Sequence, residues 1–292
     1  MTVGRISHCP VCDAALDAGS PCPVALSTPR GVRTWAKCPE CRSFFSTAPY
    51  DQTLEVEHTR TRPWGIVKSG IVLNDEKEPM FKAVLRALRP YAAPGSRLLD
   101  IGCSYGGFLF QAQKEGYKVR GVDIVPEAVE YVRSKGIPCD LAGSLRSLDI
   151  PPDSLAVVSA LDCNYYWPNQ RSELRAIWSA LHPGGVLAMR TVDTSWAIQL
   201  GLWLMKWSPG AGKRLCEKSV YDHRVSIPAR SLLHVVRQEG FRVIYTSPRD
   251  AMQFRHNSLK IKLAYAVGHV AWRIARYNLA PGFVFVARKE RL

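Results

Sequence analysis

Short apolar runs alternate with apolar positions at helical spacing through the middle of the chain. The runs typical of buried strands cover residues 97–101, 118–124, 155–161 and 186–192. Helical spacing predicts helices before and between these runs, over residues 78–88, 107–115, 126–135 and 170–181. Strands separated by helices of this length predict an α/β fold with a doubly wound, largely parallel sheet and right-handed crossovers.

The C-terminal part adds two more helix–strand pairs, expected over residues 228–239, 241–247, 257–276 and 283–289. The third of these, a long helix, gathers apolar positions on one side: Leu259, Leu263, Ala266, Val267, Val270 and Ile274. Its basic residues lie elsewhere on the helix, at Lys260, Lys262, Arg273 and Arg276. We expect the apolar side to pack against the sheet. Peripheral contact with an anionic membrane is the less favoured alternative.

Two Cys-x-x-Cys pairs lie near the N-terminus, CPVC at residues 9–12 and CPEC at residues 38–41. Each pair can place two thiolates on one tight turn, so Cys9, Cys12, Cys38 and Cys41 together predict a closed tetrahedral zinc site of the structural kind. A segment this short and rich in Pro, Ser and Gly would depend on the metal for folding. We therefore expect a zinc ribbon over residues 1–48, with Cys22 left as a spare thiol, and a connector over residues 49–76.

Composition restricts the class of protein only broadly. Of the 292 residues 47% are hydrophobic and 22% charged, as in a packed globular protein. The first residues lack the apolar core of a signal peptide and no apolar run is long enough to span a membrane, so a cytoplasmic location is expected. The net charge is +14, and residues 191–292 hold 17 basic against 6 acidic side chains. Such a basic part could hold RNA, an acidic small molecule or an anionic membrane, or could simply be solvated.

The strand at residues 97–101 runs into a glycine-rich turn, LLDIGCSYGG. This turn lacks the middle glycine of the dinucleotide-binding fingerprint. It does place Asp100 just before the turn, two residues ahead of Gly102, where a carboxylate suits a ligand that bears an ammonium or sulfonium group. The next strand ends at Asp123, about 20 residues beyond the turn, where an acid can accept hydrogen bonds from both ribose hydroxyls.

These motifs resemble those of the class I S-adenosylmethionine-dependent methyltransferases, over roughly residues 80–292. LLDIGCSYG is similar to the family's first motif, GVDIVPEAVEYV to its second, and LHPGGVLAM to the loop before strand five. The resemblance implies a Rossmann-like seven-stranded sheet with an antiparallel last strand, in a domain spanning residues 77–292. It also implies S-adenosyl-L-methionine as cofactor, held by residues that match the motifs: Asp100, Gly102, Cys103, Ser104, Gly106, Asp123 and Ile124.

The remaining candidate site residues follow the third and fourth strands. Ser144 lies where relatives often carry an acid for the adenine amine, and Asp162 keeps the acid at the end of strand four. Tyr165-Tyr166 replaces the Glu-His of quinone-modifying relatives. These tyrosines could stack against the methionine part of the cofactor or shape the acceptor pocket, with ordinary packing as the alternative, and Tyr166 is a candidate catalytic residue.

Methyl transfer to oxygen requires a group that accepts the acceptor's proton. His223 precedes the helix expected from residue 228, a place where related enzymes carry a histidine over the active site, and it is the candidate base. Asp193, just past strand five, is a second candidate.

An insertion at residues 195–227 contains WAIQLGLWLMKW, which predicts either a hydrophobic lid or an ordinary buried helix. A ribbon ahead of this domain also resembles deoxysugar methyltransferases. The favoured function is therefore O-methylation of a small molecule, sugar, glycan or natural product. The alternative is methylation of bases in ribosomal or other RNA, with the ribbon binding RNA. A non-catalytic binding module is the least favoured function. The sequence does not indicate an oligomeric state.

Overall fold

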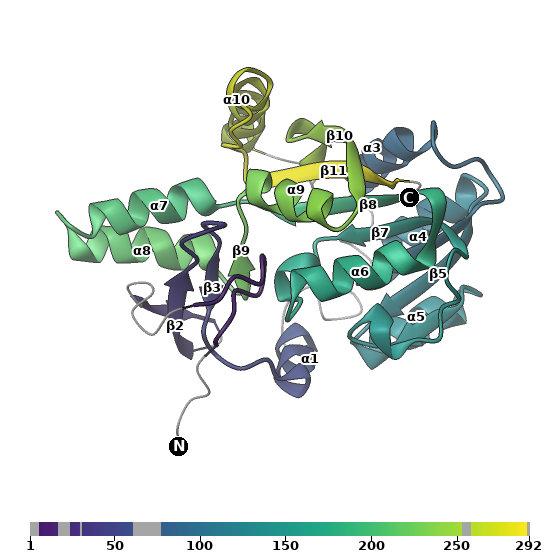
Figure 1. Cartoon of the computed structure of the whole chain (residues 1–292), viewed down its shortest axis with the longest axis horizontal. Helices are drawn as coiled ribbons and strands as arrows, with labels where there is room; N and C mark the ends of the chain where they lie inside the picture. Colours follow the sequence, from purple (N-terminus) through teal and green to yellow (C-terminus); the bar gives the residue numbers. More distant parts are fainter. Residues whose placement is uncertain (1–5, 17–23, 30, 61–76, 253–257, 291–292) are drawn as a thin grey trace.

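A computed structural model describes residues 6–16, 24–29, 31–60, 77–252 and 258–290. Its centre is a seven-stranded sheet in the order β10-β11-β8-β7-β4-β5-β6 (Figure 1). The strands are β4 (Arg97–Ile101), β5 (Lys118–Asp123), β6 (Cys139–Leu141), β7 (Leu155–Leu161), β8 (Leu181–Val192), β10 (Phe241–Ser247) and β11 (Gly282–Lys289). β11 runs antiparallel to both β8 and β10, and the other neighbouring strands are parallel, so the expected Rossmann-like sheet with an antiparallel last strand is confirmed.

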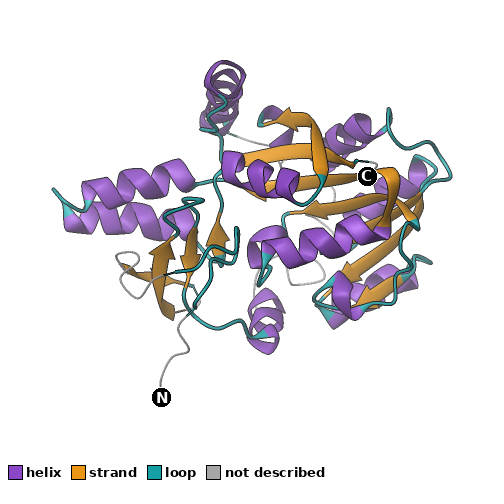
Figure 2. Ribbon diagram, viewed as in Figure 1, coloured by secondary structure: helices purple, strands orange, loops and turns teal. Residues whose placement is uncertain are grey.

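Helices cover both faces of this sheet (Figure 2). One face packs against α6 (Gln170–Ala180) and α9 (Ala229–Gln238), and the other against α3 (Glu78–Leu88), α4 (Gly107–Lys114) and α5 (Pro126–Ser134). The central strands β4 and β7 begin and end where the apolar runs predicted, because apolar residues fill strands that are buried on both faces. Short 3₁₀ helices lie at Leu145–Ser147, Asn164–Tyr166 and Arg249–Ala251.

The N-terminal part forms a second, four-stranded sheet in the order β1-β2-β3-β9. Its first three strands are β1 (Val24–Thr28), β2 (Gly31–Lys37) and β3 (Phe44–Ser46), and the fourth, β9 (Val225–Ser226), comes from far along the chain. Phe44 pairs with Ser226 and Phe45 with Val225 in an antiparallel ladder. The segment around the cysteine pairs is therefore joined to the main body by main-chain hydrogen bonds.

The insertion after β8 forms a hairpin of two helices, α7 (Ser195–Leu204) and α8 (Pro209–Val220). The hairpin extends from the main body beside β2 and β3 (Figure 1). Ile198 and Cys216 of the hairpin share a core with Trp35 and Phe44 of the N-terminal sheet. The sequence allowed either a hydrophobic lid or an ordinary buried helix for this insertion. In the structure one side of the hairpin is buried, and this side packs against the N-terminal sheet.

Two elements differ from expectation. Residues 52–60, expected to be part of an irregular connector, form the helix α1 (Gln52–Arg60); residues 61–76 of that connector lie outside the described residues, as does Cys22. The long helix α10 (Leu259–Ala275) exists, but the expected packing of its apolar side on the sheet is wrong. That side faces solvent, because Tyr265, Gly268 and Trp272 on the opposite side make the contact with the body. None of the described helices is long and apolar enough to cross a membrane.

Candidate active site

A cavity of about 350 Å³ lies at the carboxyl ends of β4, β5 and β7. Where the connections after two neighbouring parallel strands run to opposite faces of the sheet, a crevice forms at the carboxyl ends of the strands. Doubly wound sheets bind their ligands in this crevice. Its volume is within the range of about 300–1,000 Å³ that is usual for small-molecule sites. Apolar and aromatic residues form much of its wall: Met80, Phe81, Tyr105, Phe108, Leu161, Trp167 and Val192.

The turn after β4 depends on a glycine. Gly102 has a φ of +69°, and a Cβ on it would lie 2.6 Å from the Cβ of Cys163. A larger residue would therefore strain the backbone and push the loop after β7 away. Gly106 caps α4 from the left-handed region, with φ of 75°, but does not line the cavity. Its contribution is to turn the chain into α4, whose first residue, Gly107, does line the cavity.

Asp123 lies at the end of β5 with its carboxylate held by two backbone amides. Ser104 N donates to Oδ2 at 2.7 Å and Val125 N donates to Oδ1 at 2.9 Å. Burial raises the pKa of Asp123, and these two hydrogen bonds oppose that rise by stabilising the charged form. Each oxygen of a carboxylate can accept more than one hydrogen bond, and Asp123 lines the cavity.

Asp100, at the other side of the same turn, has a different environment. Ser159 Oγ donates to its Oδ1 at 2.7 Å, and only 3% of the residue is exposed. Burial raises the pKa of Asp100 to about 7; the hydrogen bond from Ser159 lowers it and the nearby charge of Asp123 raises it further. Asp100 can therefore change its charge near neutral pH in the absence of a cationic ligand.

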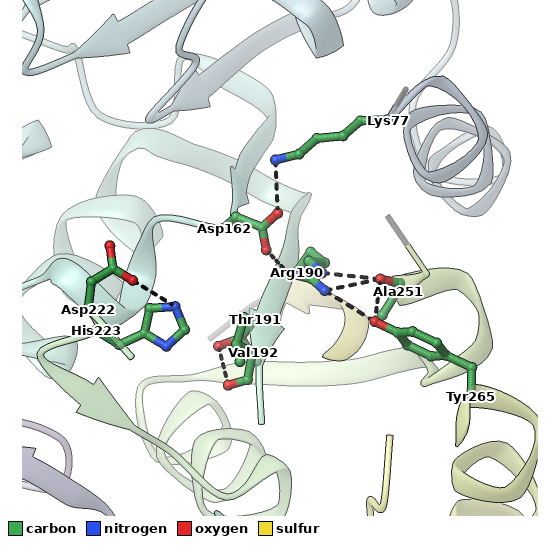
Figure 3. Close-up of polar contacts among 9 residues, drawn as sticks. All are labelled: Lys77, Asp162, Arg190, Thr191, Val192, Asp222, His223, Ala251 and Tyr265. Atoms are coloured by element: carbon green, nitrogen blue, oxygen red, sulfur yellow. Dashed lines mark hydrogen bonds and ion pairs between the residues drawn. The ribbon is translucent and has the colours of Figure 1, made fainter. Parts of the chain in front are cut away.

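Asp162, after β7, is held by two cations from different elements (Figure 3). Arg190 of β8 forms an ion pair with its Oδ1, and Lys77 Nζ lies 3.4 Å from its Oδ2. Burial by itself lowers the pKa of Arg190, but the carboxylate of Asp162, together with Tyr265 and Tyr165, outweighs it, so the net shift is upward. Arg190 Nη2 also donates to the carbonyl of Ala251 at 3.2 Å and to Tyr265 Oη at 3.4 Å. Asp162 is therefore fixed in place as a charged group.

A second polar group gathers around Asp222, which lines the same cavity. Tyr166 Oη donates to Asp222 Oδ2 at 2.9 Å, and His58 Nε2 of α1 lies 3.5 Å from the same oxygen. His223 Nε2 lies 3.8 Å from Asp222 Oδ1, a contact that Figure 3 draws and that is an ion pair when the imidazole is protonated. The ring of Tyr165 packs on His223 with centroids 4.0 Å apart. This arrangement can orient an imidazole and stabilise its protonated form.

Most of the residues expected at the site line this one cavity: Asp100, Gly102, Cys103, Ser104, Asp123, Ile124, Asp162, Tyr166 and His223. Ser144 does not line it, since its hydroxyl donates to Glu173 Oε1 at 2.6 Å while Ala142 and Gly143 face the cavity. Asp193, the second candidate base, does not line it either. Its carboxylate accepts from Ser195 Oγ at 2.6 Å and from Ala229 N at 2.9 Å, which suits a structural role at the helix starts.

Sequence reasoning missed Asp222, His58 and Arg190. Asp222 could have been found from its position directly before His223, since an acid beside a histidine often orients it. His58 gave no such signal, because α1 has little amphipathic pattern and reaches the cavity only through the tertiary fold. Arg190 is a charge inside an apolar strand run, and a charge in such a run needs a buried partner.

The four predicted metal ligands come together at the N-terminus. The Sγ atoms of Cys9, Cys12, Cys38 and Cys41 all lie within 4.8 Å of one another. The Sγ atoms of Cys9 and Cys41 are 3.6 Å apart, and those of Cys12 and Cys38 are 3.7 Å apart. A tetrahedral ion with bonds of about 2.3 Å to sulfur holds its ligands about 3.8 Å apart, so the cluster has the size that zinc requires.

This cysteine cluster is connected to the cavity through the chain around His223. β9 begins two residues after His223 and completes the N-terminal sheet beside β3. Arg224, between them, donates to the carbonyls of Ala48 at 2.9 Å and Pro49 at 3.3 Å. On the other side, the carbonyl of Pro10, in the first cysteine turn, accepts from Gln170 N of α6 at 2.8 Å. The N-terminal segment thus helps to position one wall of the cavity.

Comparison with known proteins agrees with this fold. The family described as "Methyltransferase domain" matches residues 73–246. A ubiquinone biosynthesis O-methyltransferase of Xanthomonas campestris is 30% identical over 109 residues, or 35% of this chain and 45% of the relative. A protein of the same name from Xanthomonas euvesicatoria is 25% identical over 59% of this chain and 76% of the relative. The match thus spans less than half the length of the first of these relatives.

Solved structures share the fold at low sequence identity. One is from the complex between the Haloferax volcanii Trm112 methyltransferase activator and a methyltransferase, with a TM-score of 0.55 and 16% identity, covering 78% of this chain and 96% of that chain. Another is geranyl diphosphate C-methyltransferase of Streptomyces coelicolor, with a TM-score of 0.50 and 13% identity, covering 73% of this chain and 79% of that chain. Both resemblances concern the fold alone.

Proposed function

Because the chain belongs to the methyltransferase-domain family, we propose that it transfers a methyl group from S-adenosyl-L-methionine to an oxygen atom of a small-molecule acceptor. The observation that carries this proposal is one cavity lined by two chemically different groups of residues, which we call its two walls. One wall holds three fixed carboxyls at strand ends, and the other holds a histidine beside Asp222 and two tyrosines. The ubiquinone biosynthesis O-methyltransferases among the relatives support a small-molecule acceptor over RNA.

The first wall suits the cofactor. Asp123, with its orientation fixed by two amides, would accept hydrogen bonds from the ribose hydroxyls. Asp100 lies beside the turn where the cationic methionine part would bind, and the aromatic wall would hold the adenine. Bound in this way, the cofactor supplies an activated methyl group, so the protein's main task is to align the acceptor in line with it.

The second wall suits an acceptor with an acidic hydroxyl. We propose that the imidazole of His223 accepts the hydroxyl proton as the oxygen attacks, and that the carboxylate of Asp222 stabilises the resulting imidazolium. Tyr166 would keep Asp222 in place through its hydrogen bond at 2.9 Å. Tyr165, packed on the ring of His223, would limit its rotation.

We also propose that the four cysteines bind one zinc ion in a structural role. Their sulfur atoms supply all four positions of a tetrahedral shell, which leaves none for substrate. The metal's contribution would be to hold the two cysteine turns, and through β3 the strand that follows His223.

Replacing Asp123 by alanine is expected to weaken cofactor binding by about 2–3 kcal/mol, or about 30- to 150-fold, since two charge-assisted hydrogen bonds are lost. Titration calorimetry with S-adenosylhomocysteine measures this directly. Asp140→Ala is the matched control, because this carboxylate of the same sheet pairs with the half-exposed Arg120 and does not line the cavity. Equal affinities for Asp123→Ala and wild type would show that the ribose site is elsewhere.

Affinity for S-adenosylmethionine is expected to rise by up to about tenfold between about pH 6 and pH 8, as Asp100 ionises. The sign follows from its pKa of about 7 in the free protein: below this pH the carboxyl is neutral and cannot attract a cationic ligand. Asp100→Asn should remove this rise in affinity with pH. Ionisation of the ligand itself affects wild type and variant equally, so it does not contribute to the difference between them. An identical pH dependence in the variant would contradict this role for Asp100.

The proposed activity is tested by transfer of a labelled methyl group from S-adenosylmethionine into a cell extract divided into RNA and small-molecule fractions. Label in the small-molecule fraction, absent with Asp123→Ala, is the expected result, and chromatography of the product would then identify the acceptor. Label that enters only the RNA fraction and disappears with ribonuclease would replace this proposal with RNA methylation.

A further inference from the structure

The apolar side of α10 is exposed to solvent along the whole helix. Five residues at intervals of three or four form this stripe, which we call the α10 stripe: Leu259, Leu263, Val267, Val270 and Ile274. Their exposed fractions are 82%, 62%, 48%, 55% and 82%. Single exposed apolar residues are common on protein surfaces, but a continuous row along four turns of one helix usually marks an interaction surface.

The orientation of α10 is fixed by contacts on its opposite side. A Cβ on Gly268 would lie 2.5 Å from Ala280 N, so the helix approaches the segment before β11 closely. Trp272 packs on Phe283 with ring centroids 4.5 Å apart, and its Nε1 donates to Thr246 Oγ1 at 3.0 Å. Tyr265 is buried against the carbonyl of Ala251. The stripe therefore cannot turn inward without breaking these contacts, and the helix stands out from the body (Figure 1).

The charges around the stripe are all positive. The sequence contains no aspartate or glutamate between Asp250 and Glu290. On a helix with 100° per residue, Lys262 and Arg273 lie along one edge of the stripe and Lys260 lies along the other. Among the described residues, no ion pair is found for these three side chains, so their charges are available to a partner.

We propose that α10 docks the enzyme on an anionic lipid surface, with the α10 stripe in the acyl boundary and the flanking basic residues at the lipid headgroups. An apolar face bordered by lysine and arginine is the arrangement of helices that lie in the plane of a membrane interface. Long basic side chains at the stripe's edges can reach the headgroups while their stems cover apolar surface. This docking is independent of the acceptor and of the transfer reaction.

A second copy of the chain fits this surface less well. Two stripes placed face to face would bring two sets of lysines and arginines together, with no acidic residue on either helix to offset them. Anionic lipid supplies both the apolar layer and the opposite charge. Attraction of about 1 kcal/mol for each basic residue near such a surface is about a fivefold gain in affinity.

The test is cosedimentation of the full-length protein with phosphatidylcholine vesicles that do or do not contain phosphatidylglycerol. Binding is expected only with phosphatidylglycerol and should weaken with added salt. Lys260→Glu with Lys262→Glu should weaken binding about tenfold or more, since two attractions become repulsions. Leu263→Ser with Ile274→Ser should weaken it similarly by removing apolar area, and should leave thermal stability unchanged because both residues are exposed.

The matched control is Val32→Ser, which removes an apolar side chain of β2 that is 72% exposed and lies outside the α10 stripe. It should bind vesicles like wild type. Failure of the wild-type protein to bind, or unchanged binding of both α10 variants, would overturn the proposal. A dimer in size-exclusion chromatography that Ile274→Ser converts to a monomer would overturn it too, because a second copy would then cover the stripe. Methyl transfer to a water-soluble acceptor should be unaffected by these variants, which separates this proposal from the proposed function.

Discussion

Replacing His223 by alanine is expected to lower kcat for methyl transfer by a factor of about 10²–10⁴, which is the usual contribution of a positioned general base. Among the described residues, His223 is the histidine that lines the cavity, and it lies beside Asp222. Affinity for S-adenosylhomocysteine should stay near that of wild type, because His223 is not among the proposed cofactor contacts. The measurement is the initial rate of label transfer at saturating cofactor.

His182→Ala is the matched control for this experiment. His182 lies in the exposed stretch at the start of β8, where its ring contacts the carbonyl of Pro183, and it does not line the cavity. Tyr166→Phe, which removes the hydrogen bond to Asp222, should have a smaller effect than His223→Ala. An undiminished kcat in His223→Ala would mean that the acceptor's proton leaves by another route, and His58 would then be the next residue to replace.

Replacing Cys38 by serine is expected to remove the metal and to unfold the N-terminal sheet. Structural zinc contributes about 10–16 kcal/mol of apparent binding free energy in small zinc-dependent folds, more than most domains have as net stability. Metal analysis should find about one zinc per wild-type chain and much less than one in the variant. The variant should also lose solubility, because Phe44, Phe45 and Trp35 would be exposed.

Cys216→Ser provides the comparison, since it removes a buried thiol of α8 that is outside the cysteine cluster. It should keep its zinc even if its melting temperature falls. Folded wild-type protein that contains no metal after purification without chelators would contradict the zinc site.

The strands of the main sheet could be predicted because they are buried on both faces. In β4 and β7 apolar residues occupy most positions, and glycine, proline or aspartate bounds them, so their ends are visible in the sequence. The carboxyls near strand ends could be placed for the same reason, since each lies within one residue of the end of β4, β5 or β7. Asp100, Asp123 and Asp162 therefore fell into one cavity.

Features that depend on contacts between distant segments could not be predicted. β9 has only two residues, and it is a strand only because β3 lies beside it. For α10, periodicity identified which residues share a side but not whether that side faces the protein or solvent. The contact that decides this involves Gly268, which has no side chain for a hydropathy pattern to register.

The pairing of β3 with β9 also sets an order of events during synthesis. The cysteine turns and β1–β3 leave the ribosome well before the strand that completes their sheet, which follows His223 and is made after most of the methyltransferase domain. Domains usually fold from the N-terminus as they emerge. Here the first segment must hold an incomplete sheet with an open edge, which is prone to pairing with other chains, until residues 225–226 arrive. Early capture of metal by the cysteines would keep this edge in a defined shape through that interval.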